Sequence, residues 1–143
     1  MRTITAGTLA VVIFLAGALA GTAVSAQRRP PDPQCGSASA QVRTTLYFGL
    51  SKQKGSVSEL EWQMFLRDEV TSRFPDGLTT WEADGQWRRA DGAIDHERSK
   101  VLLLVHPDTP TAKSAVQSVI ERYRKAFEQE SVLWETARVC AAA

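Results

Sequence analysis

The chain has 143 residues with 17 basic and 16 acidic side chains, so its formal net charge is only +1. It contains no long basic run, and a nearly neutral chain lacks the electrostatic pattern of proteins that bind nucleic-acid phosphates. We therefore expect no nucleic-acid partner. The length fits one small domain once the apolar N-terminal segment is set aside.

This N-terminal segment, residues 1–26, has the pattern of a secretory signal peptide. A positive charge precedes the apolar stretch 8–19, and small residues lead to a cleavage site after Ala26. An uncleaved membrane anchor is the alternative, because residues 3–27 carry no charge and are long enough to span a bilayer. The arginine pair at 28–29 disfavours an anchor whose C-terminal side is outside. We therefore expect an exported protein, periplasmic or extracellular, without a membrane attachment after cleavage.

The two cysteines lie near the two ends of the part that is expected to fold. Residues 27–40 are rich in Pro, Gly and Ser and predict a flexible tether, and the domain is expected over residues 41–140. Reactive thiols are one interpretation of Cys35 and Cys140. In an oxidising compartment a structural disulfide between them is the favoured interpretation.

The first predicted elements are a strand and an amphipathic helix. Residues 41–50 alternate in polarity, as expected of a strand with one buried face. Residues 56–74 carry apolar side chains at helical spacing, and Ser58 with Glu61 fits a capping box. The sequence FPDG at 74–77 ends this helix, because proline disfavours its continuation and Asp-Gly is typical of turns.

Two further strands are expected over residues 78–89 and 94–106. Residues 101–105 form an uninterrupted apolar run, which is typical of a central strand buried on both faces. Each of the Asp-Gly pairs at 84–85 and 91–92 is compatible with a turn.

Of these two pairs, we assign a bulge to the first and the hairpin turn to the second. This choice pairs Trp87 with His96 across the hairpin.

The last predicted elements are a second helix and a strand. Asp108 or Thr109 is expected to cap the helix, and Pro110 suits its first position. The following residues keep a continuous apolar stripe at helical spacing up to residue 127. Residues 131–140 predict the final strand.

The order β-α-β-β-α-β predicts a ferredoxin-like fold of the α+β class. Its four-stranded antiparallel sheet carries both helices on one face, in the spatial order fourth, first, third, second strand. This order places the run 101–105 on an interior strand. It also brings the start of the first strand beside the end of the last, so that Cys35 approaches Cys140. The cysteines did not enter the choice of topology and therefore support it independently.

Three segments resemble a bacterial family of exported proteins known as domain of unknown function 3574. They are WQMFLRDEVTSRFPDGLT at 62–79, DGQW at 84–87 and ERSKVL at 97–102. The resemblance spans roughly residues 44–138, and FPDGLT is its most specific part. It implies export and a small α+β domain. It implies no reaction, cofactor or partner, and it supplies no catalytic residues.

Aromatic and aliphatic residues form the first candidate site, on the sheet face that carries no helix. Period-two counting directs Leu133 and Val139 toward the helices. It directs Tyr47, Leu102, Leu104 and Trp134 to the helix-free face. Trp81 joins them or not, depending on the bulge expected at 84–85. An exposed patch of this kind usually marks an interface. We predict a face-to-face homodimer, and a pocket for a small apolar or aromatic ligand is a compatible alternative, as is an envelope-protein partner.

The second candidate site consists of Asp76, Gln86, Trp87, Glu97 and Lys100, of which Asp76, Glu97 and Lys100 are the candidate catalytic residues. A carboxylate near a lysine can perform general acid–base chemistry. A solvated ion pair and a turn aspartate are the simpler interpretation. We therefore favour a non-enzymatic binding or interaction module, and the alternative is a cofactor-independent enzyme in which Asp76 or Glu97 is the base.

The histidine and cysteine spacings predict no metal site. His96 and His106 lie at opposite ends of one expected strand, about 33 Å apart, and cannot bind one metal together. Neither H-x-x-x-H nor C-x-x-C spacing occurs. Phosphate-binding loops and a nucleophilic serine motif are also absent, so we expect no cofactor.

Overall fold

The alternating and helical patterns of the sequence produce the expected elements in the expected order. A computed structural model describes residues 34–88 and 91–142, and the predicted signal peptide lies outside these residues. The elements of the described part are β1 (Ser39–Gly49), α1 (Glu59–Phe65), the π-helix η1 (Leu66–Thr71), β2 (Thr79–Arg88), β3 (Ile94–His106), α2 (Pro110–Phe127) and β4 (Leu133–Ala141). Within the described residues, no helix combines the length and apolar character needed to cross a bilayer.

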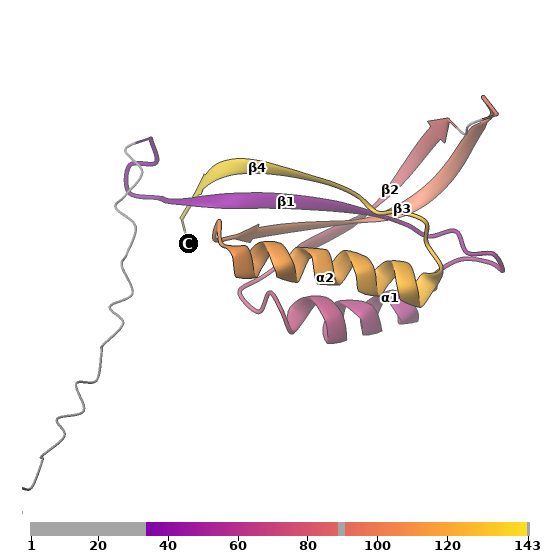
Figure 1. The fold of residues 1–143 in the computed structure, drawn as a ribbon, viewed down its shortest axis with the longest axis horizontal. Helices are drawn as coiled ribbons and strands as arrows, with labels where there is room; N and C mark the ends of the chain where they lie inside the picture. Colours follow the sequence, from indigo (N-terminus) through magenta and orange to yellow (C-terminus); the bar gives the residue numbers. More distant parts are fainter. Residues whose placement is uncertain (1–33, 89–90, 143) are drawn as a thin grey trace, which may run out of the picture.

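The four strands form one antiparallel sheet in the order β2-β3-β1-β4, and both helices cover the same face of it (Figure 1). This arrangement confirms the predicted α+β, ferredoxin-like fold. Cys35 and Cys140 form a disulfide with a Cα–Cα distance of 5.2 Å, as the strand order requires. The disulfide fastens the segment before β1 to the end of β4.

Local signals set where both helices begin. The Ser58 hydroxyl accepts a hydrogen bond from the Glu61 N–H at 3.3 Å, and Ser58 N–H donates to the Glu61 carboxylate at 2.8 Å, which confirms the capping box. The Thr109 hydroxyl caps α2 by accepting from Ala112 N–H at 3.1 Å, with Pro110 in the first turn. The helix expected over 56–74 is shorter and widens into η1.

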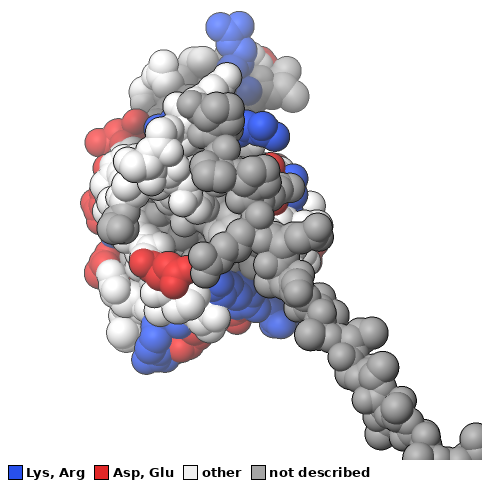
Figure 2. All heavy atoms as spheres, turned by 90° about the vertical axis from the view of Figure 1, so that its left-hand side faces the viewer, with Lys and Arg blue, Asp and Glu red and all other residues white. Residues whose placement is uncertain are grey.

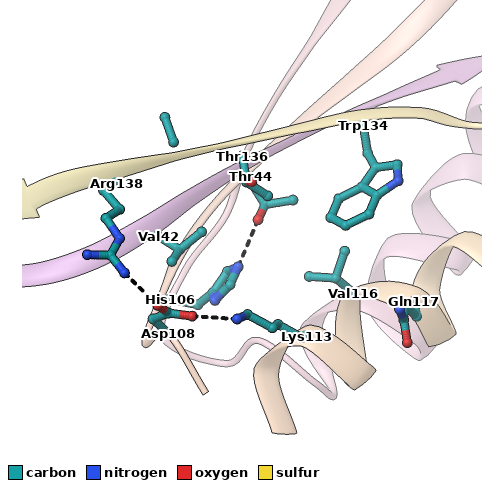
Figure 3. A pocket seen from close by; sticks show the side chains of 11 residues that line it. Val42, Thr44, His106, Asp108, Lys113, Val116, Gln117, Trp134, Thr136 and Arg138 are labelled. Carbon is teal, nitrogen blue, oxygen red and sulfur yellow. Dashed lines mark hydrogen bonds and ion pairs between the residues drawn. The ribbon is translucent and has the colours of Figure 1, made fainter. Parts of the chain in front are cut away.

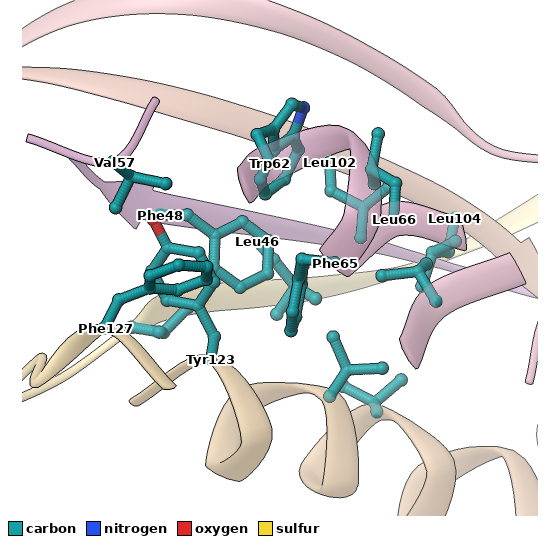
Figure 4. Packing of buried hydrophobic residues seen from close by; sticks show 14 of the residues in the cluster. Leu46, Phe48, Val57, Trp62, Phe65, Leu66, Leu102, Leu104, Tyr123 and Phe127 are labelled. Carbon is teal, nitrogen blue, oxygen red and sulfur yellow. The ribbon is translucent and has the colours of Figure 1, made fainter. Parts of the chain in front are cut away.

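The core lies between the helices and the inner side of β1 and β3 (Figure 4). Phe48 packs on Tyr123 of α2 with ring centroids 4.5 Å apart and on Trp62 of α1 at 5.4 Å. The Tyr123 hydroxyl donates to the Gly49 carbonyl at 2.8 Å, and burial strongly raises the pKa of this phenol. These contacts fix both helices on the sheet.

The predicted facing of two β3 leucines is wrong. Leu102 lies directly opposite Leu46, and Leu104 lies opposite Thr44, so both leucines point toward the helices and belong to the core. The run 101–105 is apolar throughout, so its composition contains no alternation from which the direction of each side chain can be determined.

The predicted facing of β4 is also wrong. Trp134 lies opposite Leu46 and therefore points to the helix side of the sheet. Leu133 and Val139 consequently lie on the helix-free side. Leu133 and Trp134 are adjacent apolar residues on an edge strand, so polarity alone does not distinguish its two faces.

The hairpin between β2 and β3 differs from the prediction by one residue. Trp87 pairs with Asp95 rather than His96, and the last pair before the turn is Arg88 with Ile94. The pairing is one-to-one along the whole hairpin, so the Asp-Gly pair at 84–85 lies in a regular ladder and not in a bulge.

Candidate functional site

The helix-free side of the sheet, which we call the open face, carries a line of large apolar side chains. Trp81, Val101, Tyr47 and Leu133 lie directly opposite one another on the four neighbouring strands. We call them the apolar row. Trp81 is 43% exposed and Leu133 is 67% exposed, whereas Val101 between the two aromatic residues is only 1% exposed. The row thus leaves apolar surface in water at both of its ends.

Few charged groups accompany the apolar row. The Tyr47 hydroxyl donates to the Glu135 carboxylate at 3.3 Å. Desolvation and the neighbouring carboxylate raise the pKa of this phenol. Farther along the face, Val105 is exposed beside Arg43 of the neighbouring strand. Tyr47 and Trp81 lie on the face where the sequence placed them, and their role in binding is still a prediction.

A hollow of about 500 Å³ lies at one end of the open face, where Tyr47 and Leu133 of the apolar row line it together with small and polar residues. Gly49 and Ser99 are paired neighbours in its wall. A Cβ atom at Gly49 would lie 2.6 Å from the Glu97 carboxylate oxygen, so only glycine accommodates this side chain without a shift. The carboxylate accepts a hydrogen bond from Ser51 N–H at 3.1 Å. Glu97 therefore holds the chain just beyond β1.

Lys100 lies on the opposite, helix-covered side of the sheet. Its ammonium group donates to Glu59 at 2.6 Å and to Glu82 at 2.7 Å. Burial alone would lower its pKa, but these two hydrogen bonds raise it overall. The same contacts lower the pKa of both carboxyl groups. Lys100 is thus a protonated cation that links α1 to the sheet.

The three candidate catalytic residues do not meet. Asp76 is exposed and precedes β2, where it lines a shallow hollow with His106 at the far end of β3. Glu97 and Lys100 lie on opposite faces of β3. The structure therefore offers no shared cleft in which one of the carboxylates works with the lysine.

A second cavity, which we call the α2–β4 pocket, was not anticipated from the sequence (Figure 3). It has a volume of about 400 Å³ and lies on the helix side of the sheet, between α2 and the β4 edge strand. Trp134 lines it together with Arg138, which is four residues farther along β4 and therefore shares its face. This spacing was the signal in the sequence that could have identified the pocket.

His106 forms part of the wall of the α2–β4 pocket. It is buried, and its Nε2 lies 2.8 Å from the Thr44 hydroxyl while its Nδ1 lies 3.0 Å from the Pro107 carbonyl. Since a carbonyl only accepts, Nδ1 carries the proton that it donates. In the neutral ring the Thr44 hydroxyl then donates to Nε2. The ring is held in place by both contacts.

Across residues 34–88 and 91–142, no group of three His, Cys, Asp or Glu side chains is arranged to hold a metal ion. Figure 2 shows acidic and basic side chains interspersed over the end of the molecule that it faces. Their mixture gives this surface no extended field of one sign.

Comparison with known proteins identifies a family. The chain belongs to the family described as "Protein of unknown function (DUF3574)", which matches residues 43–142. No curated protein matches the chain.

Several solved structures are similar to this chain at low sequence identity. The complex of a phage SAM lyase with S-methyl-5'-thioadenosine has a TM-score of 0.54 at 14% identity, covering 71% of this chain and 90% of the lyase chain. The apo lyase has a TM-score of 0.53 at 15% identity, with the same coverage. CutA from Synechococcus elongatus PCC7942 with Bis-Tris has a TM-score of 0.49 at 12% identity, covering 74% of this chain and 87% of CutA. The lyase likeness shows the fold alone.

Proposed function

We propose that this chain is an exported, non-enzymatic interaction domain that pairs with a second copy of itself through the open face. The exposed apolar row is the observation that carries the proposal. Exposed apolar surface costs about 25 cal/mol per Å², and a contiguous patch of it commonly marks an interface. The separation of Asp76, Glu97 and Lys100 supports a binding role over acid–base catalysis.

The pattern of the row suits a two-fold interface. A two-fold axis parallel to the strands would set Trp81 of one copy against Leu133 of the other, and Val101 against Tyr47. Arg43 would face Val105, since these residues are paired neighbours on the central strands. Neither along the apolar row nor at Arg43 and Val105 would like charges therefore meet.

The strands are staggered, and the apolar row lies where all four of them overlap. All four strands lie side by side only at residues 45–47 of β1, and β1 and β3 continue side by side over residues 42–49. Pairing about this two-fold axis would therefore centre on the apolar row.

The disulfide supports the compartment in this proposal. Bonds such as Cys35–Cys140 persist mainly in oxidising environments outside the cytosol. The signal-peptide pattern of residues 1–26 points the same way.

Sedimentation velocity on the oxidised chain without residues 1–26 tests the proposal. We expect the wild-type chain to sediment as a dimer, and Trp81→Glu and Leu133→Glu to sediment as folded monomers. Leu60→Glu is the matched control, because Leu60 is an exposed leucine on α1. A monomeric wild-type chain would refute the proposal, as would dimers that persist in both open-face variants. Far-UV circular dichroism establishes that each variant is folded.

A further inference from the structure

The α2–β4 pocket exists because the sheet extends beyond the helix that covers it. β4 is the edge strand beside β1, and it has no buried residue. Trp134 points toward the helix side yet is 46% exposed. Helix α2 therefore covers β1 but leaves the inner side of β4 partly uncovered, and the resulting wedge is the pocket.

One half of the pocket is apolar. Figure 3 shows the indole of Trp134 projecting from β4 toward Val116 of α2, with Val42 of β1 farther along the same wall. Val116 and Val42 belong to the buried part of the structure and hold this wall in place. An indole face opposite a branched aliphatic side chain suits a flat aromatic or aliphatic group.

The other half of the pocket is charged. The Asp108 carboxylate lies 2.8 Å from Lys113 Nζ and 3.7 Å from Arg138 Nη2. Among the described residues that line the pocket, two cations and one carboxylate leave this end with one positive charge in excess. The Arg138 side chain is 88% exposed, so its guanidinium can turn toward a ligand without leaving a buried position.

These charges favour an anionic ligand over a cationic one. A cation at this end would have to compete with Lys113 for Asp108 and would meet the excess positive charge. A carboxylate, by contrast, can accept paired hydrogen bonds from the guanidinium of Arg138. The volume of about 400 Å³ lies in the range of small-molecule sites, about 300–1,000 Å³.

We propose that the α2–β4 pocket binds a small organic carboxylate with an aromatic or aliphatic body. The body would lie between Trp134 and Val116, and the carboxylate would pair with Arg138. This site is on the other side of the sheet from the open face, so it does not depend on self-association of the chain.

Titration of the ¹⁵N-labelled, oxidised chain with 3-phenylpropionate tests this site, with 3-phenylpropionamide as the uncharged probe. The indole N–H signal of Trp134, identified by its loss in Trp134→Phe, is expected to shift saturably with the carboxylate. The amide is expected to bind about tenfold more weakly, because it lacks the charge that pairs with the guanidinium. The signal of Trp81 on the open face is expected to stay in place.

Substitutions locate the two halves of the site. Trp134→Ala is expected to weaken binding of the carboxylate by about tenfold or more, and Arg138→Gln is expected to remove the preference for carboxylate over amide. Val139→Ala is the matched control, because this side chain neighbours Arg138 on β4 but lies on the helix-free side, outside the apolar row. The proposal fails if Trp134 shows no saturable shift, if amide and carboxylate bind equally, or if Arg138→Gln keeps the preference. Binding that persists in the Trp81→Glu variant separates this result from self-association.

Discussion

Replacing both Cys35 and Cys140 by alanine tests how the domain is closed, because their disulfide joins positions 105 residues apart. In the chain-entropy model a loop of this length restricts the unfolded chain by about 4.8 kcal/mol at 25 °C. Residual structure in the unfolded chain reduces this value, so we expect a loss of about 3–4.5 kcal/mol in the free energy of unfolding. For a domain of this size the melting temperature then falls by more than about 10 °C.

The structure also predicts where the double alanine variant loosens first. β4 has no buried residue and is held by its ladder to β1 and by the disulfide. Amide exchange is therefore expected to accelerate in β4 before it does so in β3, which lies in the core.

Urea denaturation gives the free-energy difference, and hydrogen exchange gives its location. If the free energies of unfolding of the wild-type chain and the double alanine variant differ by less than about 1 kcal/mol, closure of the loop by the disulfide does not stabilise the domain as argued. Exchange in β4 that stays as slow as in β3 would show that the disulfide does not hold the edge strand.

Three further substitutions probe the ion pairs and a helix cap. Hydrogen bonds from Lys52 and the helix cap lower the pKa of Glu61 to about 2, so its contribution to stability is present above pH ~4.5 and is lost as the pH falls toward 2. In urea denaturation at several pH values, Glu61→Gln is expected to reduce the fall in the free energy of unfolding between pH ~4.5 and 2. An equal reduction in Glu121→Gln would contradict the assignment to Glu61. Lys100→Met is expected to lower the free energy of unfolding by about 1–2 kcal/mol, since two hydrogen bonds to carboxylates are lost; an unchanged urea midpoint would count against it. Thr109→Ala is expected to cost about 1 kcal/mol by thermal melting, and Thr109→Ser to recover most of it; equal melting points for both would argue against the cap.

Much of the fold was predictable because several local signals agreed. The capping box at Ser58, the Thr109 cap with Pro110 and the interior run 101–105 each defined one element. Their order allowed one sheet topology, and the disulfide matched it independently. Consistency between levels of this kind is what allows a sequence to specify a fold.

The sheet face on which each candidate site residue lies was harder to predict, because it depends on the register of the strands. A shift of one residue reverses every side chain on a strand, and neither the run 101–105 nor the pair Leu133-Trp134 contains the alternation that would fix the direction. The hairpin register likewise differs by one residue from the register that a two-residue turn at Asp91-Gly92 would give.

The contacts of Lys100 show a second limit of the sequence. Glu82 is its direct cross-strand neighbour in the hairpin and was missed through the one-residue register error, whereas Glu59 on α1 lies 41 residues away and no local pattern connects it to Lys100. Burial of an ammonium group between two elements is a property of the packed structure, which sequence spacing alone does not reveal.

The pairing of open faces is tested most directly by contacts between differently labelled copies of the oxidised chain. In an equimolar mixture of labelled and unlabelled protein, isotope-filtered nuclear Overhauser effects report only contacts between copies. We expect contacts between the Trp81 indole of one copy and the Leu133 methyl groups of the other. Contacts that instead involve Leu60 and α1, or an associated protein without any contact from the apolar row, would contradict the account.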